Sequence, residues 1–291
     1  MQAEKSLTAP RPTAPSNNAL KAAEGAGRYG RKKAQLRYSF VERATPDDPP
    51  PPLAQMLRGG RGGHVRLKLY LSYLWMQRDD VAQGLTFTAR AWATLLDLPD
   101  PPKAGARRIS DAQSWLTEHR FITVESQPGR PNQVVVLNET GSGEPYIAPG
   151  AAAKKEAATN LSGAVLHRYV QIPKTFWLNG HLTLLSGAGL AMFLVLLCER
   201  GPADDDTALW FSPKQAQNRY ALSEDTRGKG LRELANAGLV TTKRRAINPT
   251  DFEVVHMRNV HYLKLGRLDE TAAFTPKRRV VRIPKKRAGT G

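Results

Sequence analysis

The chain has 291 residues, of which 41% are hydrophobic, and this is enough apolar material for two packed domains. The formal net charge of +17 is typical of proteins that bind an anionic partner, most often nucleic acid. The single cysteine, Cys198, excludes a disulfide within the chain, and its apolar neighbours favour a small buried side chain over a reactive thiol.

The N-terminal stretch contains no apolar segment of the kind that marks a secretory signal. The longest apolar run, residues 187–198, is too short to cross a bilayer. We therefore expect a cytoplasmic, nucleoid-associated protein that has no membrane partner.

The positive charge is concentrated at the two ends of the chain. Residues 1–38 contain eight lysines and arginines against two acids, and residues 271–291 contain seven against none. Few aromatic residues and scattered Pro, Gly and Lys are typical of disordered segments. We predict disordered basic tails over residues 1–38 and 269–291.

Residues 39–140 have the pattern of a small mixed α+β domain. After a proline-rich connector at 49–52, the spacing of apolar residues predicts a helix over 65–78. A short strand is expected at 85–87, and helices are expected at 89–98 and 106–119. Two alternating segments, 121–125 and 133–137, flank a turn at 128–131 and predict a hairpin.

Residues 141–163 are rich in Gly, Ala and Lys and predict a linker to a second domain over 164–268. This domain begins with a strand and a short turn at 169–177. The helix at 189–199 is apolar on nearly every face, so we place it at the centre of a core. A strand at 209–211 and helices at 215–222 and 223–237 follow, and a hairpin over 241–265 ends the domain. Ser223 is expected to cap the third helix, and Gly238 to close it in a left-handed conformation.

The two domains show the same order of elements and weak sequence correspondence. The apolar pairs Leu85/Leu209 and Leu98/Leu222 are 124 positions apart. The pair Leu116/Leu234 is 118 positions apart, and the difference of six falls in the turn that begins at Pro99, where an insertion is tolerated. We interpret the chain as two copies of one fold.

Two helices joined by a tight turn and followed by a hairpin with a basic tip resemble a winged-helix DNA-binding domain. The resemblance implies an α+β fold of two tandem winged helix-turn-helix domains. It also implies that the helix 223–237 lies in the major groove of double-stranded DNA and that the wing 241–254 touches the backbone or the minor groove. A small apolar residue is usual at the position of Arg227, so a charged side chain there must reach outward. The residues implied to contact DNA in this copy are Thr226, Arg227, Lys229, Arg232, Lys243, Arg244 and Arg245.

In the first copy the same resemblance implies contacts at the start of its third helix and at the wing tip. Asp111 occupies the position that matches Lys229, and a carboxylate repels phosphate. We expect this copy to be the weaker reader and to pair two chains in a homodimer. Its implied contacts are Arg107, Arg108, Ser110, Gln113 and Arg130.

Tandem winged helices resemble plasmid and phage replication initiators and transcription regulators of mobile elements. No motif of a nucleotide-binding loop, a zinc protease or a Cys-x-x-Cys site is found, so we expect a non-catalytic protein with no cofactor and no metal. The acids 204–206 lack the spacing of a calcium loop. The alternative is a winged-helix protein-interaction adaptor whose tails bind nucleic acid nonspecifically.

Overall fold

The structure is a computed structural model that describes residues 12–58, 62–77, 84–126, 128–157, 167–246 and 257–275. Within these residues the fold is mixed α+β and contains three small antiparallel sheets, so the expected α+β class is confirmed. No helix in the described ranges has both the length and the apolar character that crossing a membrane requires.

The first half of the molecule, residues 33–136, is a cluster of helices followed by a hairpin. Three of its four short strands form a sheet in the order β2-β4-β3, so β2, which precedes α5 and α6, pairs with β4, the returning strand of the hairpin. Its elements are β1 (Lys33–Arg37), α2 (Tyr38–Val41), α3 (Pro52–Leu57), α4 (Gly63–Met76), β2 (Leu85–Thr86), α5 (Ala89–Leu95), the π-helical turn η1 (Pro101–Gly105), α6 (Ala106–Glu118), β3 (Ile122–Glu125) and β4 (Gln133–Val136).

The second half, residues 169–263, repeats this order. An isolated bridge between Leu209 and His261 takes the place of β2, and it pairs with the returning strand in the same way. Its elements are β5 (Tyr169–Pro173), α9 (Thr175–Leu178), α10 (His181–Leu184), α11 (Gly187–Arg200), α12 (Pro213–Tyr220), α13 (Glu224–Asn236), β6 (Val240–Ala246) and β7 (Met257–Leu263), after which comes the 3-10 turn η2 (Leu265–Asp269).

The repeat extends to the backbone conformation of single residues. Asp97 and Ala221, which are 124 positions apart, both adopt positive φ, Asp97 just after α5 and Ala221 just after α12. Arg120 and Gly238, 118 positions apart, both adopt positive φ after the third helix. The predicted left-handed closure at Gly238 is confirmed, and the first half makes the same turn with a residue that has a side chain.

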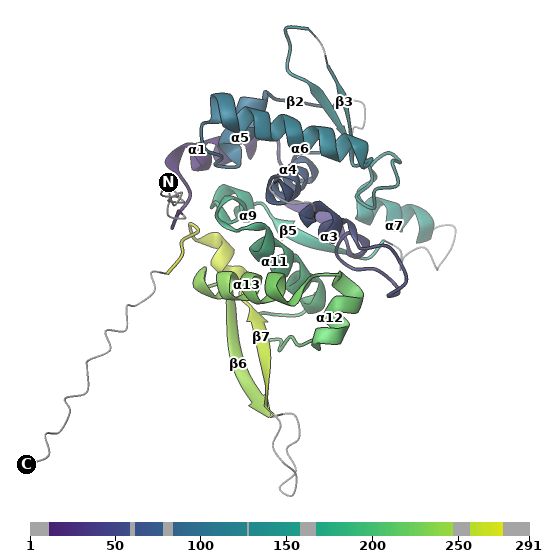
Figure 1. The fold of residues 1–291 in the computed structure, drawn as a ribbon, viewed down its shortest axis with the longest axis vertical. Helices are drawn as coiled ribbons and strands as arrows, with labels where there is room; N and C mark the ends of the chain where they lie inside the picture. The colour runs from purple at the N-terminus through teal and green to yellow at the C-terminus, as the bar shows by residue number, and fades with distance from the viewer. Residues whose placement is uncertain are drawn as a thin grey trace, which may run out of the picture.

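The two halves meet through their first strands. β1 and β5 pair antiparallel, and Gln35 faces Gln171 at the middle of the pair. Figure 1 shows the consequence for the main helices: α4, α5 and α6 lie opposite α11, α12 and α13, as a half-turn about the viewing direction would place them. The hairpins β3–β4 and β6–β7 point to opposite ends of the long axis.

A single hydrophobic core runs through both halves, so the two predicted domains pack directly against each other in the described residues. Trp75 of α4 stacks on Trp177 of α9 with ring centroids 4.9 Å apart. The buried Lys68 donates to the carbonyl of Thr183 across the same junction at 2.6 Å. The predicted central position of α11 is confirmed, because it contacts α2, α3, α4, α13, β5 and β7.

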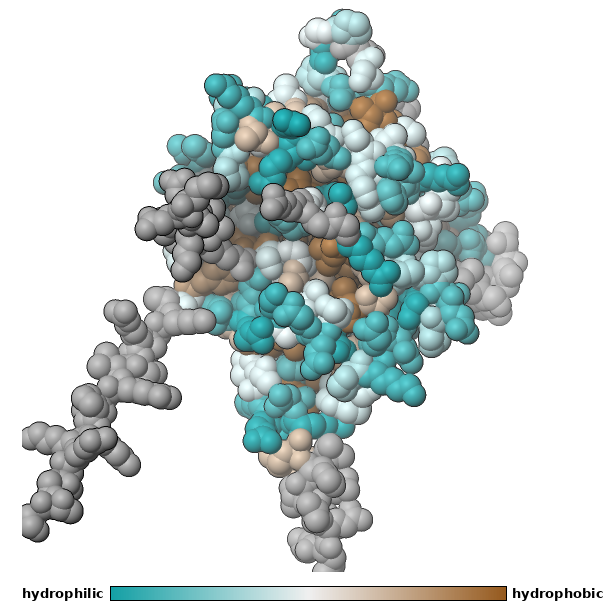
Figure 2. Space-filling model, in the orientation of Figure 1, coloured by the Kyte–Doolittle hydropathy of each residue, from teal (hydrophilic) through white to brown (hydrophobic). Residues whose placement is uncertain are grey.

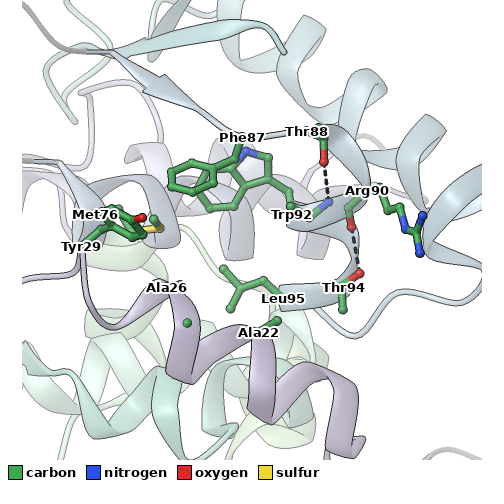
Figure 3. A pocket seen from close by; sticks show the side chains of 12 residues that line it. Ala22, Ala26, Tyr29, Met76, Phe87, Thr88, Arg90, Trp92, Thr94 and Leu95 are labelled. Atoms are coloured by element: carbon green, nitrogen blue, oxygen red, sulfur yellow. Dashed lines mark hydrogen bonds between the residues drawn. The ribbon is translucent and has the colours of Figure 1, made fainter. Parts of the chain in front are cut away.

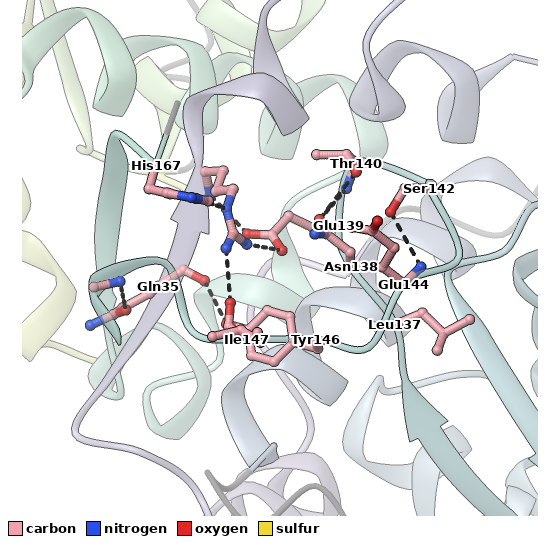
Figure 4. Close-up of polar contacts among 12 residues, drawn as sticks. Gln35, Leu137, Asn138, Glu139, Thr140, Ser142, Glu144, Tyr146, Ile147 and His167 are labelled. Carbon is pink, nitrogen blue, oxygen red and sulfur yellow. Dashed lines mark hydrogen bonds and ion pairs between the residues drawn. The ribbon is translucent and has the colours of Figure 1, made fainter. Parts of the chain in front are cut away.

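The segment predicted as a linker is also tied to this junction. Part of this segment forms α7 (Pro149–Ala157). Glu139, which immediately precedes the segment, is buried, and its carboxylate binds the guanidinium of Arg37 at 2.6 Å (Figure 4). Arg37 further donates to the carbonyl of Ile147 and to Nδ1 of His167. Residues 158–163 of the predicted linker lie outside the described residues.

The prediction of disorder over residues 1–38 is wrong from residue 12 onward. Ser16 caps helix α1 (Asn17–Ala26) by accepting from the amide of Ala19, and Ala19 and Ala23 are buried. The hydroxyl of Ser16 also donates to Asp97 at 2.6 Å, which fixes α1 beside α5. The spacing of Ala19 and Ala23 indicates a helix, but the low aromatic content of the segment led to a prediction of disorder. Residues 1–11 and 276–291 of the predicted tails lie outside the described residues.

Candidate nucleic-acid interface

Helix α13 is held rigidly against α11 by a close crossing. A Cβ atom at Gly230 would lie 2.2 Å from the carbonyl oxygen of Ala188, so only glycine allows this approach. Glu233 of α13 is buried, and its carboxylate accepts from the amide of Ser186 at 2.6 Å and from the Ser186 hydroxyl. Because Ser186 caps α11, the acid of one helix anchors the start of the other.

The opposite side of α13 faces solvent. Ser223 caps the helix as predicted, accepting from the amide of Thr226 at 3.2 Å. Lys229 and Arg232 are exposed and Thr226 is half-buried. Lys229 forms an exposed ion pair with Asp225 at 2.7 Å, and such pairs are worth little free energy in water. Its ammonium group is therefore free to exchange this partner for a phosphate.

Arg227 does not face outward, which corrects its assignment as a DNA contact. Its side chain is buried, and Nη1 donates to the carbonyl oxygen of Pro213 at 2.9 Å. Pro213 is the first residue of α12, so the guanidinium joins the second helix to the third. The charged side chain is tolerated at this inward position because a backbone carbonyl accepts a hydrogen bond from it.

The hairpin β6–β7 presents the predicted basic residues. Lys243, Arg244 and Arg245 are all exposed and pair with Val260, Asn259 and Arg258 of β7. Alternation along the strand places Lys243 and Arg245 on one face and Arg244 on the other. The ring of Tyr262 lies under the first two, with the Lys243 ammonium 5.4 Å and the Arg245 guanidinium 5.6 Å from its centroid. Residues 247–254 of the predicted wing lie outside the described residues.

The first half presents fewer of its predicted contacts. Arg107, Ser110 and the hairpin residue Arg130 are exposed. Arg108 lies 2.9 Å from the ring of His64 and is half-buried. Gln113 is wrongly assigned, because it is buried and its amide donates to the hydroxyl of Tyr73 at 2.9 Å.

Figure 2 shows mainly hydrophilic residues over the face that carries α6 and α13. Asp111 is exposed on α6, at the position that Lys229 occupies on α13. The two third helices therefore present opposite charges at matched positions. This difference makes the second half the more favourable surface for a polyanion.

Sequence reasoning missed four residues on one face of the second hairpin. Trp210 is 42% exposed, and the Arg258 guanidinium lies 4.3 Å from its ring centroid. Tyr262 lies on the adjoining part of β7 and Lys264 directly follows the strand, with the Lys264 ammonium 5.9 Å from the centroid of the Tyr262 ring. The alternation of side chains along 257–263, read together with Trp210, could have revealed this grouping.

An apolar pocket of about 400 Å³ lies elsewhere, between α1 and α5 (Figure 3). Trp92, Phe87 and Leu95 line it, and Tyr29, which is 51% exposed, stands at its side. Its polar groups are few: the Thr88 hydroxyl caps α5, and the Thr94 hydroxyl donates to a backbone carbonyl. The pocket resembles a surface for apolar contact more than a site for chemistry.

The acids at 204–206 are used in local contacts. Asp205 binds Arg200 at 3.4 Å, Asp206 binds Lys264 at 3.0 Å, and Asp204 accepts from the amide of Asp206. Across the described ranges no group of three His, Cys, Asp or Glu residues is arranged to hold a metal ion. Burial raises the pKa of the Cys198 thiol well above its usual value, so the thiol stays protonated at neutral pH.

Comparison of the chain with protein-family models, with curated proteins and with solved structures finds no match.

Proposed function

We propose that the chain is a non-catalytic protein that binds double-stranded DNA, and that each half is a winged helix. The order of helices and the position of the hairpin in each half support this fold. In the second half, α13 would enter the major groove and β6–β7 would contact the backbone. We propose that the protein acts in transcription regulation or in replication initiation of a mobile element such as a plasmid.

The observation that carries the proposal is the contrast between the two sides of α13. One side is fixed by Gly230 against Ala188 and by Glu233 on Ser186, and the other exposes Lys229 and Arg232. A helix held firmly in place with outward cations is suited to groove binding, because its backbone needs no further ordering when the complex forms. Arg232 can bind a guanine edge in a bidentate manner, and Lys229 can bind a phosphate as a point charge.

The half-turn between the halves extends this proposal to the whole molecule. The opposite directions of hairpins β3–β4 and β6–β7 (Figure 1) support a proposal in which α6 and α13 act as the two reading helices of a symmetric dimer do. One chain would then contact two major-groove segments about 10 base pairs apart. A monomer suffices for this arrangement, and homodimerisation through the first half is the competing proposal.

The test is a selection from randomised duplexes, followed by titration of the best duplex at two salt concentrations. Lys229→Ala combined with Arg232→Ala is expected to weaken binding strongly and to relax sequence preference. The matched variant, Arg107→Ala with Ser110→Ala on α6, is expected to weaken it less. Equal effects, or binding that the α13 variant leaves unchanged, would contradict the assignment of α13 as the main reading helix.

The adaptor function rests on a different observation, the apolar pocket beside the exposed Tyr29 (Figure 3). Apolar surface of this kind is typical of protein contacts. If the selection yields no preferred duplex and Tyr29→Ser abolishes capture of a protein partner, the adaptor replaces the DNA-binding function. Sedimentation of the free chain separates the monomer from the homodimer in the same preparation.

A further inference from the structure

One face of the hairpin β6–β7 combines an exposed aromatic ring with a set of cations. Trp210 is 42% exposed, and the Arg258 guanidinium lies 4.3 Å from its ring centroid. Along the same face, Lys243 and Arg245 lie over the ring of Tyr262. Strand pairing explains the grouping, because Arg245 faces Arg258 across the hairpin and Lys243 faces Val260.

Among the residues that the structure describes, none of the cations Lys243, Arg245 and Arg258 pairs with an acid. Neither β6 nor β7 contains an acidic residue. Lys264, at the base of the hairpin, by contrast binds Asp206. Like charges held close together repel each other, and a polyanion would relieve this repulsion.

Two polar atoms on this face also lack partners. Neither Nε of Arg258 nor the hydroxyl of the buried Tyr262 has a hydrogen-bond partner among the residues that the structure describes. A buried polar atom without a partner costs free energy, so a rearrangement of this face that brings an acceptor to either atom would be favourable.

The first half serves as an internal comparison, because its hairpin has the same register. The bridges Leu85–Val134 and Leu209–His261 match, so Thr86 stands where Trp210 stands and Val135 where Tyr262 stands. The pairs Ile122–Val136 and Val240–Leu263 match as well. Counting on from these pairs, Glu125 corresponds to Lys243 and Pro131 to Arg258. Every aromatic and cationic group at these positions is thus missing from the first hairpin, and one position has the opposite charge.

The chemistry of the face distinguishes an unpaired strand from a duplex. Cations alone are sufficient to bind the phosphates of a duplex, whose bases hide their ring faces in the stack. An exposed indole and a guanidinium plane offer flat surfaces that only an unstacked base can cover. Aromatic rings set among cations are therefore the pattern expected for a single strand.

We propose that the face formed by Trp210, Lys243, Arg245, Arg258 and Tyr262 binds single-stranded DNA, with a base stacked on Trp210 or on the Arg258 guanidinium. The cations bind the phosphates on either side of that base. The choice of DNA over RNA rests on the proposed function, in which α13 of the same half binds duplex DNA. The protein would then hold a duplex segment and an adjacent unpaired strand together.

The experiment measures binding of the full chain to a fluorescent thymidine oligonucleotide and, separately, to the selected duplex. Trp210→Thr, which copies the first half, is expected to weaken oligonucleotide binding about 5- to 150-fold, the range for loss of one stacked base. Duplex binding and the melting temperature should stay close to those of the parent chain. Trp210→Phe should retain most of the oligonucleotide affinity, and Tyr29→Thr, which removes another exposed aromatic ring, should retain all of it.

An oligonucleotide with the same phosphates but abasic sugars provides the sharpest control. The parent chain and Trp210→Thr should bind it equally weakly, because neither can stack a base. If Trp210→Thr binds the thymidine oligonucleotide as tightly as the parent chain does, or loses duplex and oligonucleotide binding equally, the stacking proposal is wrong. Tighter binding of a uridine RNA oligonucleotide would overturn the assignment to DNA.

The two proposals fail in distinguishable ways. A parent chain that binds the oligonucleotide through Trp210 but prefers no duplex contradicts the duplex function and leaves the stacking face intact. A parent chain that prefers one duplex but binds the oligonucleotide independently of Trp210 contradicts only the stacking face.

Discussion

The two halves share a topology and differ in almost every exposed position that matters for binding. Buried pairs such as Leu116/Leu234 and Ile122/Val240 keep their apolar character. In contrast, Lys229 is matched by Asp111, and Lys243 by Glu125. A fold is specified by its buried pattern, so the surface of a repeated unit is free to change. The comparison therefore separates the residues that build the unit from those proposed to give it a function.

The interiors of the halves also differ at one point, the crossing of α6 on α4 in the first half and of α13 on α11 in the second. Gly230 lets α13 approach α11 closely, and Ala112 occupies the matching place on α6. Glu233, which anchors Ser186, is matched by Trp115, and the guanidinium of Arg66 from α4 lies 4.7 Å from the centroid of the Trp115 ring. The second half thus fixes α13 on α11 by a polar anchor and a close crossing, and the first half joins α6 to α4 by a cation–aromatic contact.

The largest expected effect is on DNA binding through the second hairpin. A Lys243→Ala, Arg244→Ala, Arg245→Ala triple variant should bind duplex DNA more weakly and lower the slope of log K against log salt by about 1 to 2, because alternation along β6 lets either Arg244 or the pair Lys243 and Arg245 face the duplex. The first hairpin has only Arg130 for comparison, and Arg130→Ala should lower the slope by about 1 at most. Titrations at several salt concentrations measure both slopes, and an unchanged slope in the triple variant rules out the wing assignment.

The next effect concerns the close crossing in the second half. Gly230→Ala should lower the free energy of unfolding by about 1–3 kcal/mol, because the added methyl group overlaps Ala188. Gly228→Ala is the matched control on the same helix, where the new atom meets only the flexible end of Arg232. It should stabilise the protein by up to about 1 kcal/mol through helix propensity. Denaturant titration measures both, and equal effects would show that the crossing is not tight.

A smaller effect is expected when the first half is made more like the second. Asp111→Lys replaces a carboxylate on the exposed face of α6 with the ammonium found on α13. If α6 lies against DNA, binding should tighten and the salt slope should steepen by about 1. If α6 instead pairs chains or faces solvent, the affinity for the selected duplex should not change.

The smallest predicted difference concerns pH. Burial lowers the pKa of His181 and of His261, and neither α3 nor β4, the counterparts of their elements, contains a histidine. As the pH falls through the ordinary histidine pKa of about 6.5, the unfolded chain therefore binds protons at these histidines that the folded chain does not bind. Stability is full above that pKa and is lost as the pH falls below it. A His181→Gln, His261→Val variant should lose less free energy of unfolding between pH 7.5 and about 5.5 than the parent.

Much of the repeated architecture could be predicted from the sequence, because caps and apolar spacing act locally. Ser223 and Gly238 bound the third helix as expected. The junction could not be predicted, since it depends on contacts between distant segments: β1 with β5, and Arg37 with Glu139. The same limit explains the errors at Arg227 and Gln113. Helical spacing places a residue on a face, but whether Pro213 or Tyr73 offers it a hydrogen bond is decided by tertiary packing.

The most direct test of the central claim, that two unequal reading helices of one chain lie on one duplex, is a footprint of the full chain on its selected duplex. We predict two protected major-groove segments about 10 base pairs apart. The Lys229→Ala, Arg232→Ala variant should lose the stronger of the two and keep the weaker. Protection of a single segment, or of two segments that respond equally to this variant, would contradict the account.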